Sequence, residues 1–156
     1  GEPGNNTPDF KAAWMRSIEY QIIEGGTGDI IIVGGYERGK PDILFPTMKA
    51  KVTPGTRRWN PNGTLGEFGK GKNRTDWGGK PAAWKDELGA FVPPEKPTGE
   101  WNRLEAICDG ANLTYFLNGT KVNEATDASL QEGQLLFQSE GAEIYFRKIE
   151  LLPLGK

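Results

Sequence analysis

The sequence predicts an all-β sandwich of two antiparallel sheets, and three observations support this. Short segments in which apolar and polar residues alternate recur along the chain, as expected of strands that bury one face. The pairs Asp109-Gly110 and Asn118-Gly119, which favour tight turns, separate three of these segments. No segment of three helical turns shows a 3.6-residue period, and 22 Gly and 11 Pro among 156 residues indicate many turns. We expect a single domain over residues 1–156, because domains usually hold about 100–150 residues.

The N-terminal part is predicted to form a hairpin that is followed by long loops. Residues 1–9 are polar and rich in turn formers, and we expect a flexible lead-in there. A strand is predicted over residues 17–24, a turn over 25–28 and a second, more buried strand over 29–33. Residues 34–100 are dense in Gly, Pro and Trp, so we expect a loop-rich central insertion with one or two short strands. Its apolar runs are residues 43–45 and 48–52.

Five segments after residue 100 have the pattern of strands. Trp101 opens the first of them and is expected in the core, and Cys108 is expected to be a buried, unreactive thiol. As the single cysteine, Cys108 cannot take part in an internal disulfide. The predicted strands are residues 103–108, 113–117, 120–123, 133–139 and 143–152.

The composition excludes several classes of function. Lys and Arg number 19 and Asp and Glu 21, a balance that argues against a nucleic-acid partner. No apolar run approaches the length of about 18 residues that a membrane-spanning helix needs, so no membrane partner is expected. The chain has no His, which removes Ser-His-Asp and Cys-His mechanisms and His-ligated zinc sites. An enzyme with this sequence would use carboxylates, tyrosine, lysine or a metal held by oxygen ligands.

Several motifs resemble those of a known family. The runs 100–102, 108–110 and 117–122 resemble a concanavalin A-like jelly roll, in which a Trp-Asn strand start precedes a strand that ends in Asn-Gly. The stretch 133–154 is similar to the ending of the 3-keto-disaccharide hydrolase domain family, and IEYQIIEGGTGDI over 18–30 resembles a strand of the same family. The positions that match the family's ending are Gln138, Glu140-Gly141, Phe146-Arg147 and Pro153-Leu154.

The resemblance covers about residues 9–154 and implies both a fold and an activity. It implies a concanavalin A-like jelly roll that acts on 3-oxidised glycosides by hydrolysis or elimination, with a sugar or oligosaccharide as ligand. It also implies a periplasmic or secreted location, although this chain contains no signal peptide. Such domains usually have further strands ahead of the point where this chain begins. We therefore expect an open sheet edge that a partner strand or a second copy completes.

The spacing Glu19-x-Gln21-x-x-Glu24 is the strongest local signal for catalysis. It resembles the Glu-x-Asp-x-x-Glu strand of laminarinase-type glucanases, with Gln in place of the central Asp. A β-bulge near residues 22–23 would bring both carboxylates onto one face, and bulges occur beside active sites. Glu19 is then the candidate base, Glu24 the acid and Gln21 an orienting residue. The alternative is that both glutamates are solvated carboxylates on a polar face.

The chemistry of a 3-keto sugar suits a site without histidine. The ketone acidifies the hydrogen on C2, so a carboxylate such as Glu19 can remove it, and Glu24 or Tyr20 can protonate the leaving group. Gln21 or Arg147 could stabilise the enolate oxygen. The alternative for Arg147 is a structural ion pair with Glu140, a neighbour in the family's ending.

Trp77 is a candidate for stacking on a sugar, with Arg74 and Asp76 as hydrogen-bonding neighbours. The alternative is that Trp77 anchors the long central loop onto the sandwich. No cofactor is expected. A calcium-type ion held by oxygen ligands is the weaker alternative, because the candidate carboxylates lack a ligand spacing. Those carboxylates are Asp29, Glu37, Asp76 and Asp86.

Three functions from different classes remain open at this point. The first is an enzyme that acts on 3-keto-glycosides, with Glu19 as its base. The second is a non-catalytic carbohydrate-binding module on the same fold, since a fold does not fix a function. The third is an assembly subunit whose open sheet edge accepts a partner strand.

Overall fold

The computed structural model describes residues 14–36, 42–77 and 94–155, and these residues contain strands and no helix. No helix in this part of the chain is long and apolar enough to cross a membrane. The all-β prediction is therefore confirmed. The strands are β1 (Ser17–Tyr20), β2 (Ile30–Val33), β3 (Gly35–Tyr36), β4 (Ile43–Leu44), β5 (Met48–Val52), β6 (Thr64–Phe68), β7 (Arg74–Thr75), β8 (Leu104–Asp109), β9 (Asn112–Leu117) and β10 (Thr120–Ala125).

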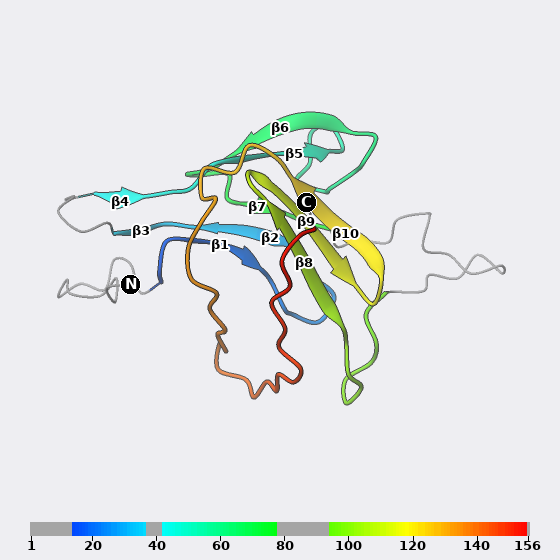
Figure 1. Ribbon diagram of the computed structural model, residues 1–156. Coiled ribbons are helices and arrows are strands. Elements are labelled where there is room, and N and C mark those ends of the chain that lie inside the picture. Colours follow the sequence, from blue (N-terminus) through cyan, green and yellow to red (C-terminus); the bar gives the residue numbers. More distant parts are fainter. Residues whose placement is uncertain (1–13, 37–41, 78–93, 156) are drawn as a thin grey trace.

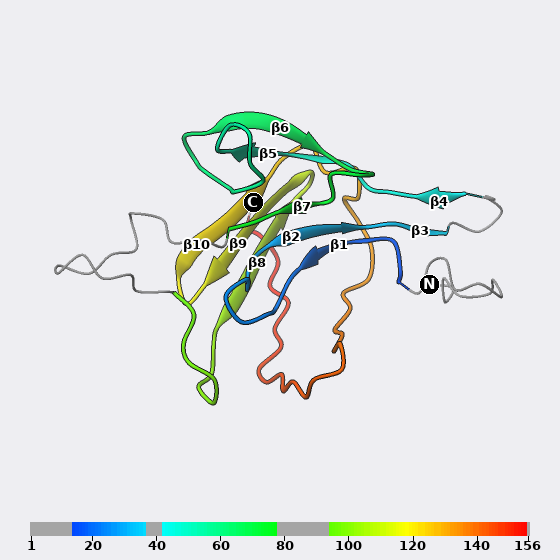
Figure 2. The same ribbon diagram turned by 180° about the vertical axis from the view of Figure 1, so that it is seen from behind.

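The strands form antiparallel sheets that are arranged as a sandwich. One sheet has the order β1-β2-β7 and the other β10-β9-β8, while β3 pairs with β4 and β5 with β6. The two three-stranded sheets form the layers of the sandwich, and the β5–β6 hairpin lies above them (Figure 1 and Figure 2). A bridge between Lys49 and Thr126 connects the start of β5 to the end of β10. This arrangement is consistent with a β-sandwich, and the jelly-roll connectivity stays a prediction.

The core lies between the two layers and is built by strands that alternate. Ile30 and Ile32 of β2 have no exposed surface, whereas the residues between and after them are half-buried. The same alternation buries Met48, Ala50 and Val52 of β5. Strand β9 contributes its odd-numbered residues from the opposite layer, and the ring of its Tyr115 stacks on Tyr20 of β1 with 4.4 Å between ring centroids. The buried members of the core are Ile30, Ile32, Met48, Ala50, Val52, Phe68, Trp77, Leu113, Tyr115, Leu117, Val122, Ala125 and Ala128.

Two tight turns connect β8, β9 and β10. Asn118 and Gly119 have φ angles of 49° and 82°, as a type I′ turn requires, so the predicted turn at this pair is confirmed. The other turn lies one residue beyond its predicted position. Asp109 still pairs with Asn112, so the two turn residues are Gly110 and Ala111.

The β1–β2 connection differs from the prediction. Strand β1 ends at Tyr20, and Gln21 is opposed by two residues of the other strand. Its backbone N–H donates to the carbonyl of Asp29 (2.9 Å), while the N–H of Gly28 donates to the carbonyl of Gln21 (2.8 Å). The β-bulge therefore lies at residues 28–29 and not at 22–23. Gly28 has a φ of 110°, and a Cβ there would lie 2.4 Å from Cγ2 of Val122.

The central region contains more strands than the prediction allowed. Strands β4 and β5 lie at the apolar runs, but β3, β6 and β7 were not predicted. Strands β3 and β7 have two residues each, too few for a period to show. Strand β6 contains Gly66 and is mostly exposed, so it lacks an alternating apolar face.

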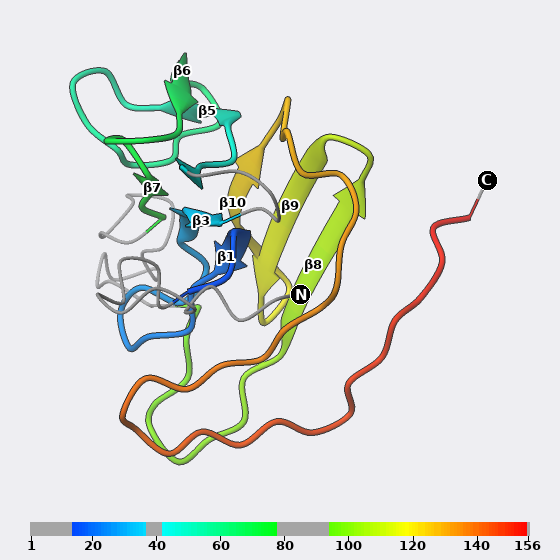
Figure 3. The same cartoon turned by 90° about the vertical axis from the view of Figure 1, so that its left-hand side faces the viewer.

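The two strands predicted over residues 133–139 and 143–152 are absent. Residues 130–155, which we call the C-terminal arm, leave the body after β10 and form no strand. Figure 3 shows the end of the arm running away from the two sheets. A strand pattern needs a neighbouring strand to hydrogen-bond with, and no sheet among the described residues includes the arm.

Candidate functional site

Glu19 is half-buried on β1, on the opposite side of the strand from Ile18 and Tyr20, which pack against the core. Burial is the main cause that raises the pKa of Glu19 above its ordinary value. The negative charge of Glu140 raises this pKa further, and a hydrogen bond from Ser17 lowers it. A carboxylate with a raised pKa is a stronger base near neutral pH, which is what proton abstraction requires.

The carboxylate that interacts with Glu19 comes from the C-terminal arm. Glu140 is exposed, and its Oε1 accepts a hydrogen bond from the side-chain amide of Gln138 (3.1 Å). The sequence indicates Gln138 and Glu140 only through the family's ending, where a structural role was the alternative. Because Glu140 lies 121 positions after Glu19 in the chain, no local sequence pattern indicates that the two residues interact.

The predicted acid, Glu24, is not the charged residue that raises the pKa of Glu19; Glu140 is. Glu24 is exposed in the loop between β1 and β2. Gln21 is half-buried at the bulge, where its backbone forms hydrogen bonds with both Gly28 and Asp29.

The loop beside Glu19 is fixed by polar contacts at both ends. The carboxylate of Glu95 accepts hydrogen bonds from the N–H of Gly25 (2.8 Å) and the hydroxyl of Thr27 (2.7 Å). On the opposite layer, the buried Nδ2 of Asn123 donates to the carbonyls of Gly28 (3.2 Å) and Thr75 (3.0 Å). The sequence points to neither Glu95 nor Asn123, because their hydrogen-bond partners lie far away along the chain.

Arg74 and Asp76 belong to an ion-pair cluster around Asp29. Asp29 is 2% exposed and accepts hydrogen bonds from the Arg74 guanidinium (2.9 Å from Nε) and the N–H of Trp77 (2.8 Å). Burial raises the pKa of Asp29, and these donors oppose the rise. Arg74 also pairs with Asp76 (3.0 Å), so the cluster fixes β7 to the loop before β2.

The calcium alternative gains no support from this cluster. A guanidinium already lies between Asp29 and Asp76, and it neutralises the charge that would attract a cation. Glu37 and Asp86 lie outside the described residues. Within the ranges that the structure describes, no group of three or more His, Cys, Asp or Glu side chains could hold a metal ion.

Trp77 and Trp101 differ in burial. Trp77 is 3% exposed and packed in the core, which supports the anchoring alternative and leaves no ring face for a sugar. Trp101, expected in the core, is 46% exposed. The guanidinium of Arg147 lies over its ring, 3.9 Å from the centroid. This contact, and not an ion pair with Glu140, is what Arg147 forms here.

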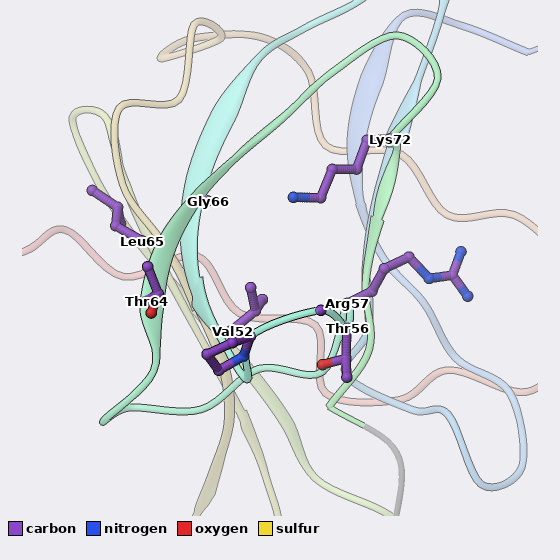
Figure 4. A pocket seen from close by; sticks show the side chains of 9 residues that line it. Val52, Thr56, Arg57, Thr64, Leu65, Gly66 and Lys72 are labelled. Atoms are coloured by element: carbon purple, nitrogen blue, oxygen red, sulfur yellow. The ribbon is translucent and has the colours of Figure 1, made fainter.

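A separate groove of about 630 Å³ lies between the loop after β5 and strand β6. The ammonium of Lys72 points across it toward Gly66, whereas the guanidinium of Arg57 points away (Figure 4). The same ammonium lies 4.2 Å from the centroid of the Phe68 ring. The described residues that line the groove include no carboxylate and are Val52, Pro54, Gly55, Thr56, Arg57, Thr64, Leu65, Gly66 and Lys72.

These observations describe an antiparallel β-sandwich protein with a carboxylate-based polar site on an edge strand. Comparison with known families makes the assignment specific. Residues 5–152 match the model of the 3-keto-alpha-glucoside-1,2-lyase-like domain, so the chain belongs to that family, and its function is carbohydrate-related. No curated protein and no solved structure matches the chain.

Proposed function

We propose that the protein cleaves 3-oxidised glycosides, with Glu19 as the general base. The observation that carries the proposal is the raised pKa of a half-buried glutamate in a chain of this family. The structure contributes two reasons for that basicity, which are the burial of Glu19 on β1 and the nearby charge of Glu140. A periplasmic or secreted location belongs to the same proposal, because it rests on the family resemblance alone.

The reaction follows from the position of the ketone. Glu19 removes the proton from C2, the electron pair forms the enolate of the C3 ketone, and the bond from C1 to the leaving group then breaks. Addition of water to the resulting unsaturated sugar would complete a hydrolysis. Glu140 has a positioning role in this scheme, since its charge makes Glu19 a stronger base.

The leaving group needs a proton, and two residues were candidates to supply it. The hydroxyl of Tyr20 donates to the carbonyl of Phe116 (2.8 Å), and burial raises the pKa of Tyr20. Tyr20 is therefore a poor acid, and Glu24 is the proposed donor. Gln21 remains the proposed orienting residue, and the exposed guanidinium of Arg147 is proposed to bind the sugar.

The test is turnover of a chromogenic 3-keto-β-glucoside, measured beside the parent glucoside. Glu19→Gln keeps the shape of the side chain and removes its basicity, so we expect kcat to fall by about 10²–10⁴ while substrate binding persists. Glu67→Gln, an exposed glutamate on β6, is the matched control and should keep full activity. Equal turnover by Glu19→Gln and the unmodified protein would refute the assignment.

The groove at Lys72 favours a second function, non-catalytic carbohydrate binding. Its apolar residues can face the C–H surface of a sugar, and its threonine hydroxyls and backbone groups can bond with sugar hydroxyls. Titration with oligosaccharides that bear a carboxylate tests this. Lys72→Met would weaken binding, Glu19→Gln would leave it unchanged, and no 3-keto-glucoside would be turned over.

A further inference from the structure

The C-terminal arm exposes more apolar surface than a free segment in water normally does. Eight of its large apolar side chains are about half to nine-tenths exposed. At roughly 150–200 Å² for each fully exposed side chain, this comes to roughly 800 Å² for each chain. The residues are Leu135, Leu136, Phe137, Tyr145, Ile149, Leu151, Leu152 and Leu154.

The second half of the arm has large apolar side chains on both faces of the strand that alternation predicts. Ile144, Phe146 and Leu152 lie on one face together with Lys148 and Glu150, and Tyr145, Ile149 and Leu151 lie on the other together with Glu143 and Arg147. Apolar side chains on both faces are typical of a strand in a sheet that is covered on both sides. The second half of the arm therefore has the sequence pattern of a strand, although no described strand pairs with it.

An open position for such a strand lies beside β1. Strand β1 pairs with β2 alone and β8 with β9 alone among the described strands, so each has a free edge. The hydroxyl of Tyr20 donates to the carbonyl of Phe116, and its ring stacks on Tyr115, so β1 lies over β9. In the part of the chain that the structure describes, no strand of the first layer lies over β8.

The register of β8 shows the same gap. Ala106 and Cys108 pair with Tyr115 and Leu113, so all four side chains face the interior of the sandwich. Tyr115 and Leu113 are buried, whereas Ala106 and Cys108 are exposed. The expectation that Cys108 is buried was thus wrong, because Cys108 is exposed in the single chain. A strand added at the free edge of β1 would cover both residues.

We propose that the arm of a second copy fills this position, so that two chains exchange arms in a two-fold dimer. Within its own chain the arm is held outside the sandwich, because Arg147 lies over Trp101 just ahead of β8 and Phe137 packs against Phe146 (4.8 Å between centroids). The C-terminal end of the arm, coloured red, runs away from β1 (Figure 3). Exchange gives the arm of one copy a sheet edge in the other.

The area is sufficient for a stable dimer. The exposed apolar side chains of the exchanged strand, Tyr145, Ile149, Leu151 and Leu152, present about 500 Å² in each chain, so two strands would bury about 1,000 Å². The partner surface that they cover adds a similar area, which brings the total to the size of a standard specific interface. The added strand would lie beside Glu19, since that residue is on β1. This proposal does not depend on the catalytic one, because the edge and the arm are present whether or not Glu19 is a base.

Sedimentation of the full chain over a range of concentrations gives the first test. We expect a dimer at micromolar concentrations, and a monomer throughout the range would overturn the proposal. Leu151 is 90% exposed within one chain, so Leu151→Asp leaves the monomer fold intact and should weaken dimerisation about tenfold or more. Leu65→Asp, at a 53% exposed position on β6, is the matched control. A dimer that is equally stable with Leu151→Asp would also overturn the proposal.

The single cysteine distinguishes exchange from folding back. One population keeps Cys108, and a second carries Cys108→Ser together with Ile149→Cys or, on the other face of the strand, Glu150→Cys. Under mild oxidation of the mixture, we expect covalent dimers between the two populations to exceed those within either one. A further variant has both Cys108 and the cysteine in the arm. A disulfide within one chain of this variant would show that the arm covers β8 of its own chain, and it would overturn the proposal that two chains exchange arms.

Discussion

Asn123 gives the sharpest test of how the two layers are held together. Its side chain has no exposed surface, and its Nδ2 donates to the carbonyls of Gly28 and Thr75 while its Oδ1 accepts from the N–H of Glu124. Asn123→Ala removes these three hydrogen bonds and leaves two buried carbonyls without that donor. At about 1 kcal/mol for each bond, with a further contribution from the cavity, we expect a loss of about 2–4 kcal/mol in the free energy of unfolding.

Asn123→Asp has nearly the same shape and a different dependence on pH. The introduced carboxylate would face two carbonyl oxygens, so the protonated form is favoured and its pKa in the folded state rises above the unfolded value of about 3.9. The unfolded chain then releases the proton at a lower pH than the folded chain does. The free energy of unfolding therefore falls as pH rises from the pKa of the unfolded state to the pKa of the folded state. The slope is about 1.4 kcal/mol for each pH unit, up to the pKa in the folded state.

Urea unfolding followed by tryptophan fluorescence between about pH 4 and pH 8 measures both effects. Asn62→Asp, at an exposed position in the turn before β6, is the control and should show no such slope. Equal stability of the Asn123→Asp and Asn62→Asp variants across this pH range would refute the reasoning, because it would mean that Nδ2 of Asn123 contributes no essential bonds.

Two further predictions concern the bulge and the candidate base. Gly28→Ala should cost about 2–5 kcal/mol in unfolding free energy, because the new Cβ meets Val122 at 2.4 Å with φ at 110°. Gly25→Ala, where nothing lies within 4 Å, should cost about 1–2 kcal/mol, and equal melting temperatures for the two variants would contradict the model of the bulge. Glu140→Gln removes a negative charge near Glu19, so the acidic limb of the pH profile of kcat/KM should move to lower pH. An unchanged limb would show that Glu140 does not affect the base.

The sequence was informative wherever a structure depends on residues close together in the chain. The Asn-Gly pair determined the β9–β10 turn, because Asn and Gly tolerate the positive φ angles of a type I′ turn better than most residues. The alternation over β5 was also sufficient to find that strand. The bulge lies at Gly28, ahead of β2, and not at residues 22–23, because the close approach of Val122 requires a glycine there.

What depended on distant packing could not be read from the sequence. Trp77 and Trp101 are both indoles beside polar residues, and their burial differs because of where β7 and β8 lie in the sandwich. The candidate base Glu19 was found from its motif, but Glu140 was not, because its effect on Glu19 depends on the course of the arm. The strand predicted over residues 143–152 is absent, because an alternating pattern forms a strand only where a neighbouring strand accepts its hydrogen bonds.

The meander of β8, β9 and β10 has a consequence for the order in which the chain folds. Each of its pairings joins neighbouring segments across a two-residue turn, so the entropy lost on closing these loops is small. The pairing of β2 with β7, in contrast, brings Ile30 and Thr75 together from distant parts of the chain. Contacts between segments close in sequence form faster than distant ones. We therefore expect the meander to form early and to provide the surface on which β1, β2 and β7 later assemble. The hydrogen bonds from Asn123 to the carbonyls of Gly28 and Thr75, which join the two layers, would form in the last step.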